Sequence, residues 1–361
     1  MWPYWIALLL CFLICYKKQR YINSNKEFVV MFISTLPFLI LAWLRDDRVG
    51  ADTAGYPLLW YEDALGCNTI ENYILAHPIT EPLYAYMTYI IAKLHPNNFY
   101  AMLFYHALIV SISIAYISKY IKDVPCWFTI LCLYLLLYHL SLNWARQLLA
   151  LSFLIISIKY ILEKRLLIFI IFVIIATGFH SISVVFLIVY PIYNIFPKYK
   201  LWKVELFLIL FVFVISYSFQ SLLSSLLDNA ILTSKYERYL DQDGFTTHKV
   251  DLLQNTIYLI IVMLTKPIDE SSLLLKKIII ELYTFCICLL LMGSIFETAS
   301  RIELFFIVPT IIFHSMYIYN NNKNPNYVYL FMLIIMSIQW IYNGLYDTWD
   351  TIRYSSKVLG I

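Results

Sequence analysis

Long apolar stretches separated by short polar stretches dominate this chain. On the order of ten stretches of about 15–21 residues carry almost no charge, and each is nearly or fully long enough to cross about 30 Å of hydrocarbon as a helix. Lipid offers the backbone no water, so these crossings should be helical. The long alternation typical of a membrane β-barrel is absent from the sequence. The pattern predicts an all-α, polytopic membrane protein in which residues 1–361 form a single integral membrane domain.

The apolar pattern places about 12 transmembrane helices along the chain. The continuous run 166–196 has basic residues at both ends, so it needs two short helices that meet near Gly178, Phe179 and His180. Residues 80–94 are interpreted as an interfacial helix within a long outer loop. The predicted spans are 2–16, 28–44, 99–119, 125–142, 146–162, 166–180, 181–196, 203–219, 251–266, 276–295, 301–319 and 326–343.

The distribution of charge orients these spans. Lys and Arg favour the cytoplasmic side of short loops, and the model with both ends outside gives the inner loops most of the 26 Lys and Arg residues. The large outer segments are then 45–98 and 220–250. The first apolar run is followed, and not preceded, by Lys17 and Lys18, so it is interpreted as an uncleaved helix.

Composition excludes several kinds of site. The mean hydropathy is +0.73 and only 14% of residues are charged. The seven cysteines show no disulfide framework and no zinc spacing. The nearest approach to an acidic metal motif, Asp241-Gln242-Asp243, is followed by Gly244 in an ordinary turn pattern. We therefore expect no metal, and the absence of a phosphate-cradling glycine loop means that side chains would hold any phosphate.

Ionisable residues gather at the predicted outer boundary. The densest group, Arg45 to Tyr56, directly follows an apolar run. Arg at membrane depth costs several kcal/mol unless it faces water or a partner, and its planar fork matches phosphate oxygens. These residues would suit a phosphorylated lipid head group at the interface. The outer-boundary candidates are Arg45, Arg48, Asp52, Glu81, Arg146, His180, Arg238 and Arg301.

A purely structural interpretation stays open for each candidate. Arg45 and Arg48 can cap a helix by pairing with neighbouring acids, and Arg301 can pair with Glu297 or Glu303 at helical spacing. A lone intramembrane His is more often a core residue than a catalyst, and loop acids are usually solvated. The residues in these two groups are His106, His139, His180 and His314, and Asp52 and Glu81.

Taken in order, the motifs resemble the EpsG/Wzy family of bacterial polysaccharide polymerases. The resemblance covers nearly the whole chain. The first motif is Arg…Val-Gly-x-Asp-Thr-x-x-Tyr, with Arg48 or Arg45 as its arginine and Tyr56 at its end. The later motifs are Glu81-Pro82-Leu83-Tyr84, Arg146-Gln147 with Ala150, Gly178-Phe179-His180-Ser181, Lys235-Tyr236-Glu237-Arg238-Tyr239 and Ala299-Ser300-Arg301.

This resemblance implies a GT-C-like enzyme of the bacterial inner membrane whose active site faces the periplasm. It would polymerise O-antigen or capsule repeat units carried on undecaprenyl diphosphate, without cofactor, metal, nucleotide sugar or nucleic acid. A chain-length regulator is a possible partner. The resemblance further implies that arginines bind the diphosphate and that a His or an outer carboxylate moves the proton. The implied sets are Arg45 or Arg48, Arg146, Arg238 and Arg301 for the diphosphate, and His180, Asp52 or Glu81 for the proton.

Two other functions compete with polymerisation. An O-antigen ligase shares the donor and the face, but it transfers the glycan to a lipid A core. A lipid-linked oligosaccharide flippase would need alternating access, usually from repeat-related halves, and no internal repeat is evident here. A purely structural membrane subunit would leave Arg146 and Arg301 within apolar sequence without a reason.

Overall fold

The computed structural model describes residues 2–18, 24–78, 80–121, 124–195, 249–293, 297–345, 351 and 353–361. Within these ranges the regular structure is entirely helical. Two compact units are distinguished: unit 1 comprises Met1–Val184 with Asn326–Ile361, and unit 2 comprises Val185–Pro325. The all-α prediction is confirmed, whereas the prediction of one integral domain and the GT-C-like fold stay predictions.

Five described helices are long and apolar enough to cross a membrane: Phe99–Tyr120, Cys126–Asn143, Ala145–Leu162, Ala299–Asn321 and Pro325–Asn343. Shorter apolar helices cover Trp2–Tyr16, Glu27–Trp43, Leu166–Phe179 and Ser181–Asn194. The chain is therefore a polytopic membrane protein. Every predicted span outside 203–219 coincides with helical structure, and 203–219 lies outside the described residues. The count of twelve and the orientation of the spans stay predictions.

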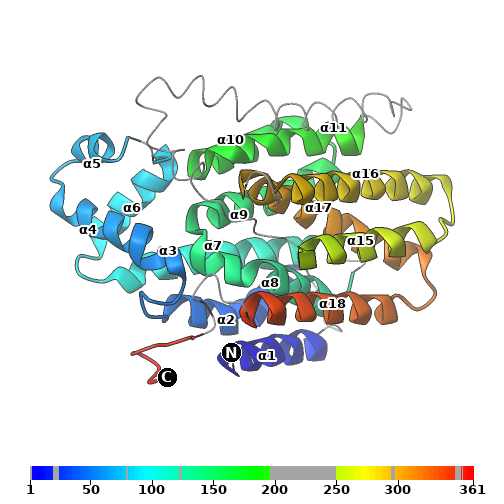
Figure 1. The fold of residues 1–361 in the computed structure, drawn as a ribbon, viewed down its shortest axis with the longest axis horizontal. Coiled ribbons are helices and arrows are strands. Elements are labelled where there is room, and N and C mark those ends of the chain that lie inside the picture. The colour runs from blue at the N-terminus through cyan, green and yellow to red at the C-terminus, as the bar shows by residue number, and fades with distance from the viewer. Residues whose placement is uncertain are drawn as a thin grey trace. The chain divides into compact units, whose positions relative to one another are not determined.

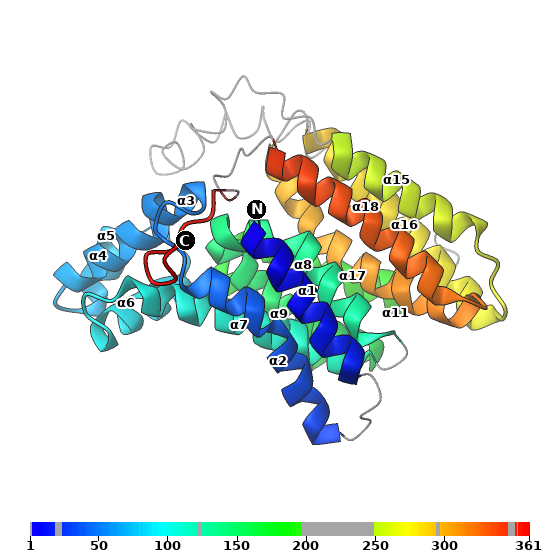
Figure 2. The ribbon, with the colours of Figure 1, turned by 90° about the horizontal axis from the view of Figure 1, so that it is seen from below.

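Unit 1 is a bundle of long helices with short helices at one end. Figures 1 and 2 both place α3 to α6 beyond the ends of the long helices α7 and α9. The long helices are α1 (Trp2–Lys18), α2 (Ser24–Trp43), α7 (Phe99–Tyr120), α8 (Cys126–Asn143), α9 (Ala145–Leu162), α10 (Leu166–Phe179) and α18 (Pro325–Leu345). The short elements are α3 (Ala51–Thr53), the π-helical turn η1 (Ala54–Leu58), α4 (Leu59–Gly66), α5 (Ile70–Ala76) and α6 (Pro82–Leu94).

Aromatic side chains form a buried cluster in unit 1. Tyr4 of α1 is fully buried, and its ring packs edge-on against Tyr138, His139, Trp340 and Tyr354 at centroid distances of 5.4 to 5.8 Å. Edge-to-face aromatic pairs stabilise a core beyond their buried area. This cluster joins both ends of the chain to α8.

Helix α6 corresponds to the predicted interfacial segment 80–94. One face of it, with Tyr84 and Ile91, is buried, while Leu83 and Ile90 are exposed. Pro82 opens the helix at a position where its missing N–H costs nothing, and it holds the preceding Glu81 in an extended conformation. The sequence Glu-Pro therefore defines where α6 begins and leaves Glu81 at its edge.

Unit 2 contains α11 (Val189–Asn194), α15 (Lys249–Leu264), α16 (Glu270–Gly293) and α17 (Glu297–Asn321). The last three pack side by side (Figure 1). In the interior, the Tyr283 hydroxyl lies 2.8 Å from His314 Nδ1, and Asn255 donates a hydrogen bond of 2.9 Å to Glu303. These two contacts pair polar groups of neighbouring apolar helices.

Candidate functional site

The first motif wraps around the end of α8. The carbonyl of Leu142 accepts hydrogen bonds from Arg45 Nη2 at 3.3 Å and from Thr53 Oγ1 at 2.9 Å. The backbone N–H of Asp52 donates to Asn143 Oδ1 at 3.2 Å. These bonds hold the last turn of α8, whose carbonyls have no partner within the helix. The motif is therefore a clamp on the junction between α8 and α9.

Gly50 makes the close approach of this clamp possible. Its φ of +95° lies where side chains are rarely accommodated, and a Cβ there would come within 2.3 Å of the Leu142 oxygen. The glycine of the Val-Gly pair is thus required by both conformation and contact.

The structure separates the two arginines that the sequence left as alternatives. Arg45 is only 3% exposed and also donates to the Ala42 carbonyl at 2.9 Å. Burial lowers the pKa of Arg45 to about 10, so the side chain remains charged at neutral pH. Arg48 is exposed. Arg45 accordingly belongs to the clamp, whereas Arg48 is open to solvent.

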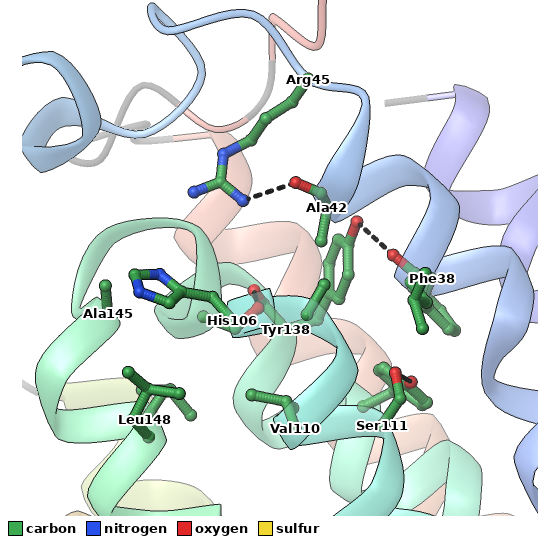
Figure 3. A pocket seen from close by; sticks show the side chains of 14 residues that line it. Phe38, Ala42, Arg45, His106, Val110, Ser111, Tyr138, Ala145 and Leu148 are labelled. Carbon is green, nitrogen blue, oxygen red and sulfur yellow. Dashed lines mark hydrogen bonds between the residues drawn. The ribbon is translucent and has the colours of Figure 1, made fainter. Parts of the chain in front are cut away.

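A small cavity lies beside Arg45 in unit 1. Figure 3 shows the guanidinium bonded to the carbonyl of Ala42, with Tyr138 bonded to Phe38 at the same cavity. Its volume of about 20 Å³ suits one water molecule and is too small for a sugar or a phosphate. The Nε of Arg45 and the Nε2 of His106 find no partner among the described residues, which agrees with a buried water there.

Next to the clamp, a break between α8 and α9 determines where Arg146 lies. Trp144 has φ −83° and ψ 58°, so α8 ends and α9 begins one residue later. Arg146 consequently lies in the first turn of α9, at the end of unit 1 where α3 to α6 gather. Its side chain is 29% exposed, and the guanidinium lies 4.9 Å from the centre of the Trp60 ring.

Glu81 joins three motifs that are far apart in the sequence. Its Oε2 accepts from Arg146 Nη1 at 2.7 Å. Its Oε1 lies 3.6 Å from His180 Nδ1 and 3.3 Å from the backbone nitrogen of Ser181, which donates to it. Glu81 and His180 are 6% and 14% exposed, so solvent screens the group only weakly. Glu81, Arg146 and His180 therefore form one cluster, the Glu81 cluster.

Charge in this cluster keeps Glu81 ionised. Burial opposes ionisation, but the interaction with His180 and the positive charge of Arg146 outweigh it and hold the pKa of Glu81 well below its usual range. A carboxylate with so low a pKa is a weak proton acceptor at neutral pH. The arrangement favours Glu81 as the partner that orients Arg146 and His180.

Gly178 allows the helix that carries His180 to reach α6. Helix α10 ends at Phe179, and His180 follows in an extended conformation before the 3₁₀ helix η2 (Ser181–Ile188). This break lies where the sequence predicted one. A Cβ on Gly178 would come within 2.6 Å of the Leu83 side chain. The glycine thus lets α10 pack closely against the first turn of α6.

Replacing Gly178 by Ala is expected to lower both thermal stability and activity, because the added methyl group displaces Leu83 and with it Glu81. Leu83→Ala in the same chain removes the obstacle, so the double variant should recover most of the lost melting temperature. The measurement is thermal unfolding in detergent of the two single variants and the double variant. Equal melting temperatures for wild type and Gly178→Ala would contradict the assigned contact.

The other candidates lie outside this cluster. Asp52 is half-buried in α3, and Arg301 belongs to unit 2, in the first turns of α17, so it is described apart from the cluster. Arg238 lies outside the described residues. In the described parts of the chain, no group of three or more His, Cys, Asp or Glu side chains is placed to hold a metal ion.

Sequence reasoning assigned no role to three participants: Trp60, Asn143 and Ser181. Asn143 had a local signal, because a polar residue directly before the Trp144 break is suited to a capping role. Trp60 had none, since its contact with Arg146 joins residues far apart in the chain.

Comparison with known proteins gives the family. No curated protein and no solved structure matches the chain. The model of the EpsG family matches residues 28–356, a range that contains every motif described above. That family includes Wzy-type polymerases. Membership in it supports, at a broad level, a polymerase-like function on polysaccharides in a membrane. The chain therefore belongs to the EpsG family.

Proposed function

We propose that this protein polymerises a cell-surface polysaccharide, O-antigen or capsule, on the periplasmic face of the bacterial inner membrane. The donor is the growing glycan on undecaprenyl diphosphate, and the acceptor is a single lipid-linked repeat unit. The observation that supports this proposal most is the way in which the Arg146 guanidinium is held. One of its nitrogens is bonded to Glu81, its carbon lies over the Trp60 ring, and the remaining N–H groups have no partner among the described residues.

The Arg146 guanidinium is suited to bind the leaving group, which is the lipid diphosphate. As the acceptor oxygen attacks the anomeric carbon, the bond between that carbon and the diphosphate oxygen breaks, and the electron pair leaves with the lipid diphosphate. A cation that is already oriented stabilises this developing charge without reorganisation. Arg146 is held by Glu81 and leaves N–H groups open toward solvent. Arg48, an exposed arginine of the same unit, is the further arginine of unit 1 that we assign to the diphosphate. A role for Arg301 is proposed from the sequence alone.

His180 is the base that we assign to the acceptor hydroxyl. If Nδ1 carries the hydrogen and faces Glu81, Nε2 is the nitrogen that can accept a proton. A carboxylate that fixes the tautomer and orientation of a His in this way is a recurring catalytic arrangement. Asp52 is the alternative base, and Glu81 is less suited because of its low pKa.

His180→Ala is expected to reduce polymerisation by roughly 100-fold or more while the protein remains folded, because a positioned base contributes about 10²–10⁴-fold. The matched control is His95→Ala, also in unit 1 and outside the cluster, which should polymerise normally. Initial rates of glycan elongation in membranes provide the measurement. Undiminished elongation with His180→Ala would transfer the role of base to Asp52.

Arg301→Ala should leave the protein inserted, while cells make only one-repeat O-chains. Arg301→Lys separates charge from geometry, because Lys keeps the charge but lacks the planar fork. We expect it to restore elongation only in part. The exposed Lys323 of the same unit provides the control, as Lys323→Ala should give the normal length distribution. Normal long chains in Arg301→Ala cells would remove Arg301 from the mechanism.

A deletion strain tests the function against its rivals through the glycan attached to lipid A. Loss of a polymerase leaves a single repeat attached, and loss of a ligase leaves none. Loss of a flippase prevents repeat units from reaching the outer face at all. We expect single repeats in the strain that lacks this protein, and full complementation by the wild-type chain.

A further inference from the structure

Trp60 is an aromatic residue in contact with Arg146. It lies in the first turn of α4, in the outer segment that follows the clamp. The Arg146 guanidinium carbon is 4.9 Å from the centre of its ring. A guanidinium at this distance over an indole face is attracted by the ring quadrupole, and Trp is the strongest of the aromatic side chains in this respect.

The ring itself is fixed by its neighbours. Tyr56, Tyr84 and His77 contact it at centroid distances of 5.7, 5.6 and 6.0 Å, all with interplanar angles of 65° to 69°. Tyr84 is fully buried, so this contact reaches the interior of unit 1. Side chains packed against several partners cannot change rotamer freely. Trp60 is thus a rigid surface and not a mobile one.

Together, Trp60 and Glu81 restrict Arg146 in two ways. Glu81 fixes the position of one nitrogen through a bond of 2.7 Å. A single bond of this kind still allows the guanidinium plane to rotate about it, and contact with the ring face opposes that rotation. Two restraints of different geometry define both where the group lies and which way its free N–H groups point. Bidentate binding of phosphate depends on that plane.

We propose that Trp60 is a positioning residue that sets the plane of the Arg146 guanidinium for the diphosphate of the lipid carrier. This inference rests on the proposed function, because it takes the diphosphate as the ligand of Arg146. Trp60 acts through Arg146 and does not itself contact the reacting atoms.

Binding of undecaprenyl diphosphate to the purified, full-length protein tests the assignment, with undecaprenol as the lipid that lacks the diphosphate. Trp60→Leu should raise the Kd for undecaprenyl diphosphate by roughly 3- to 30-fold, the range of cation–π contacts. Trp60→Phe retains an aromatic face and should give a smaller increase. Neither variant should change the Kd for undecaprenol.

A double-mutant cycle with Arg146→Gln makes the test specific. If Trp60 acts through the guanidinium, Trp60→Leu should change the Kd by less than about 2-fold once Arg146 is Gln. The same loss in both backgrounds, or no loss in either, would overturn the assignment. Trp60→Phe extends the test to a variant with a nearly native core, should Trp60→Leu unfold. Failure of the wild-type protein to prefer undecaprenyl diphosphate over undecaprenol would instead reject the proposed function.

Discussion

Arg146→Ala is expected to stop glycan elongation, with a loss of at least about 100-fold, because removal of one oriented charge at a developing anion typically costs 10²–10³-fold. Cells should then carry only one-repeat chains. The substitution also removes the bond from Arg146 Nη1 to Glu81 and leaves that buried carboxylate without its cation. Length distributions of the cell-surface glycan provide the measurement.

A second substitution separates this catalytic loss from a loss of folding. Glu81→Gln neutralises the carboxylate, so the double variant with Arg146→Ala should regain thermal stability while elongation stays absent. Arg165→Ala is the matched control, because Arg165 is an exposed arginine of the same unit with a carboxylate neighbour, Glu163. Normal elongation by Arg146→Ala, or recovered elongation in the double variant, would contradict a role for Arg146 at the diphosphate.

Gly50→Ala is expected to destabilise unit 1 by about 2–5 kcal/mol, because the methyl group meets the Leu142 carbonyl at 2.3 Å in a backbone conformation that only glycine adopts readily. The displaced clamp should also move the start of α9, so elongation should fall as well. Gly55→Ala is the control, since nothing lies within 4 Å of a Cβ at Gly55.

Thermal unfolding of the two glycine variants in the same detergent provides the comparison. The expected result is a clearly lower melting temperature for Gly50→Ala and a nearly unchanged one for Gly55→Ala. Similar melting temperatures for both would mean that the clamp around Leu142 contributes little to the fold.

The sequence predicted the helices well because each membrane span carries its own local signal of length and apolarity. The break at Gly178 to His180 was also predicted from a local signal, because basic residues at both ends of one apolar run require two crossings. The side-chain partners were not predictable in this way. Arg45 and Arg48 differ by three positions and look alike in sequence, yet only Arg45 meets the Leu142 carbonyl, 97 residues away.

The candidate site was predicted in part. The outer-boundary argument selected Glu81, Arg146 and His180, and the structure brings these three together. The pairing of Glu81 with Arg146 could not be read from spacing, because it depends on how α6 packs against α10, which itself packs against α9. The same packing favours an orienting role for Glu81 over the role of base. A catalytic role for the cluster stays a prediction.

The most direct test of the proposed function uses the purified wild-type protein in liposomes, supplied only with lipid-linked single repeat units from its own strain. We predict a ladder of longer lipid-linked glycans and release of one undecaprenyl diphosphate for each bond formed, without nucleotide sugar. Single repeats that stay unextended, or that merely change leaflet, would contradict the proposal that this EpsG-family protein is a polymerase.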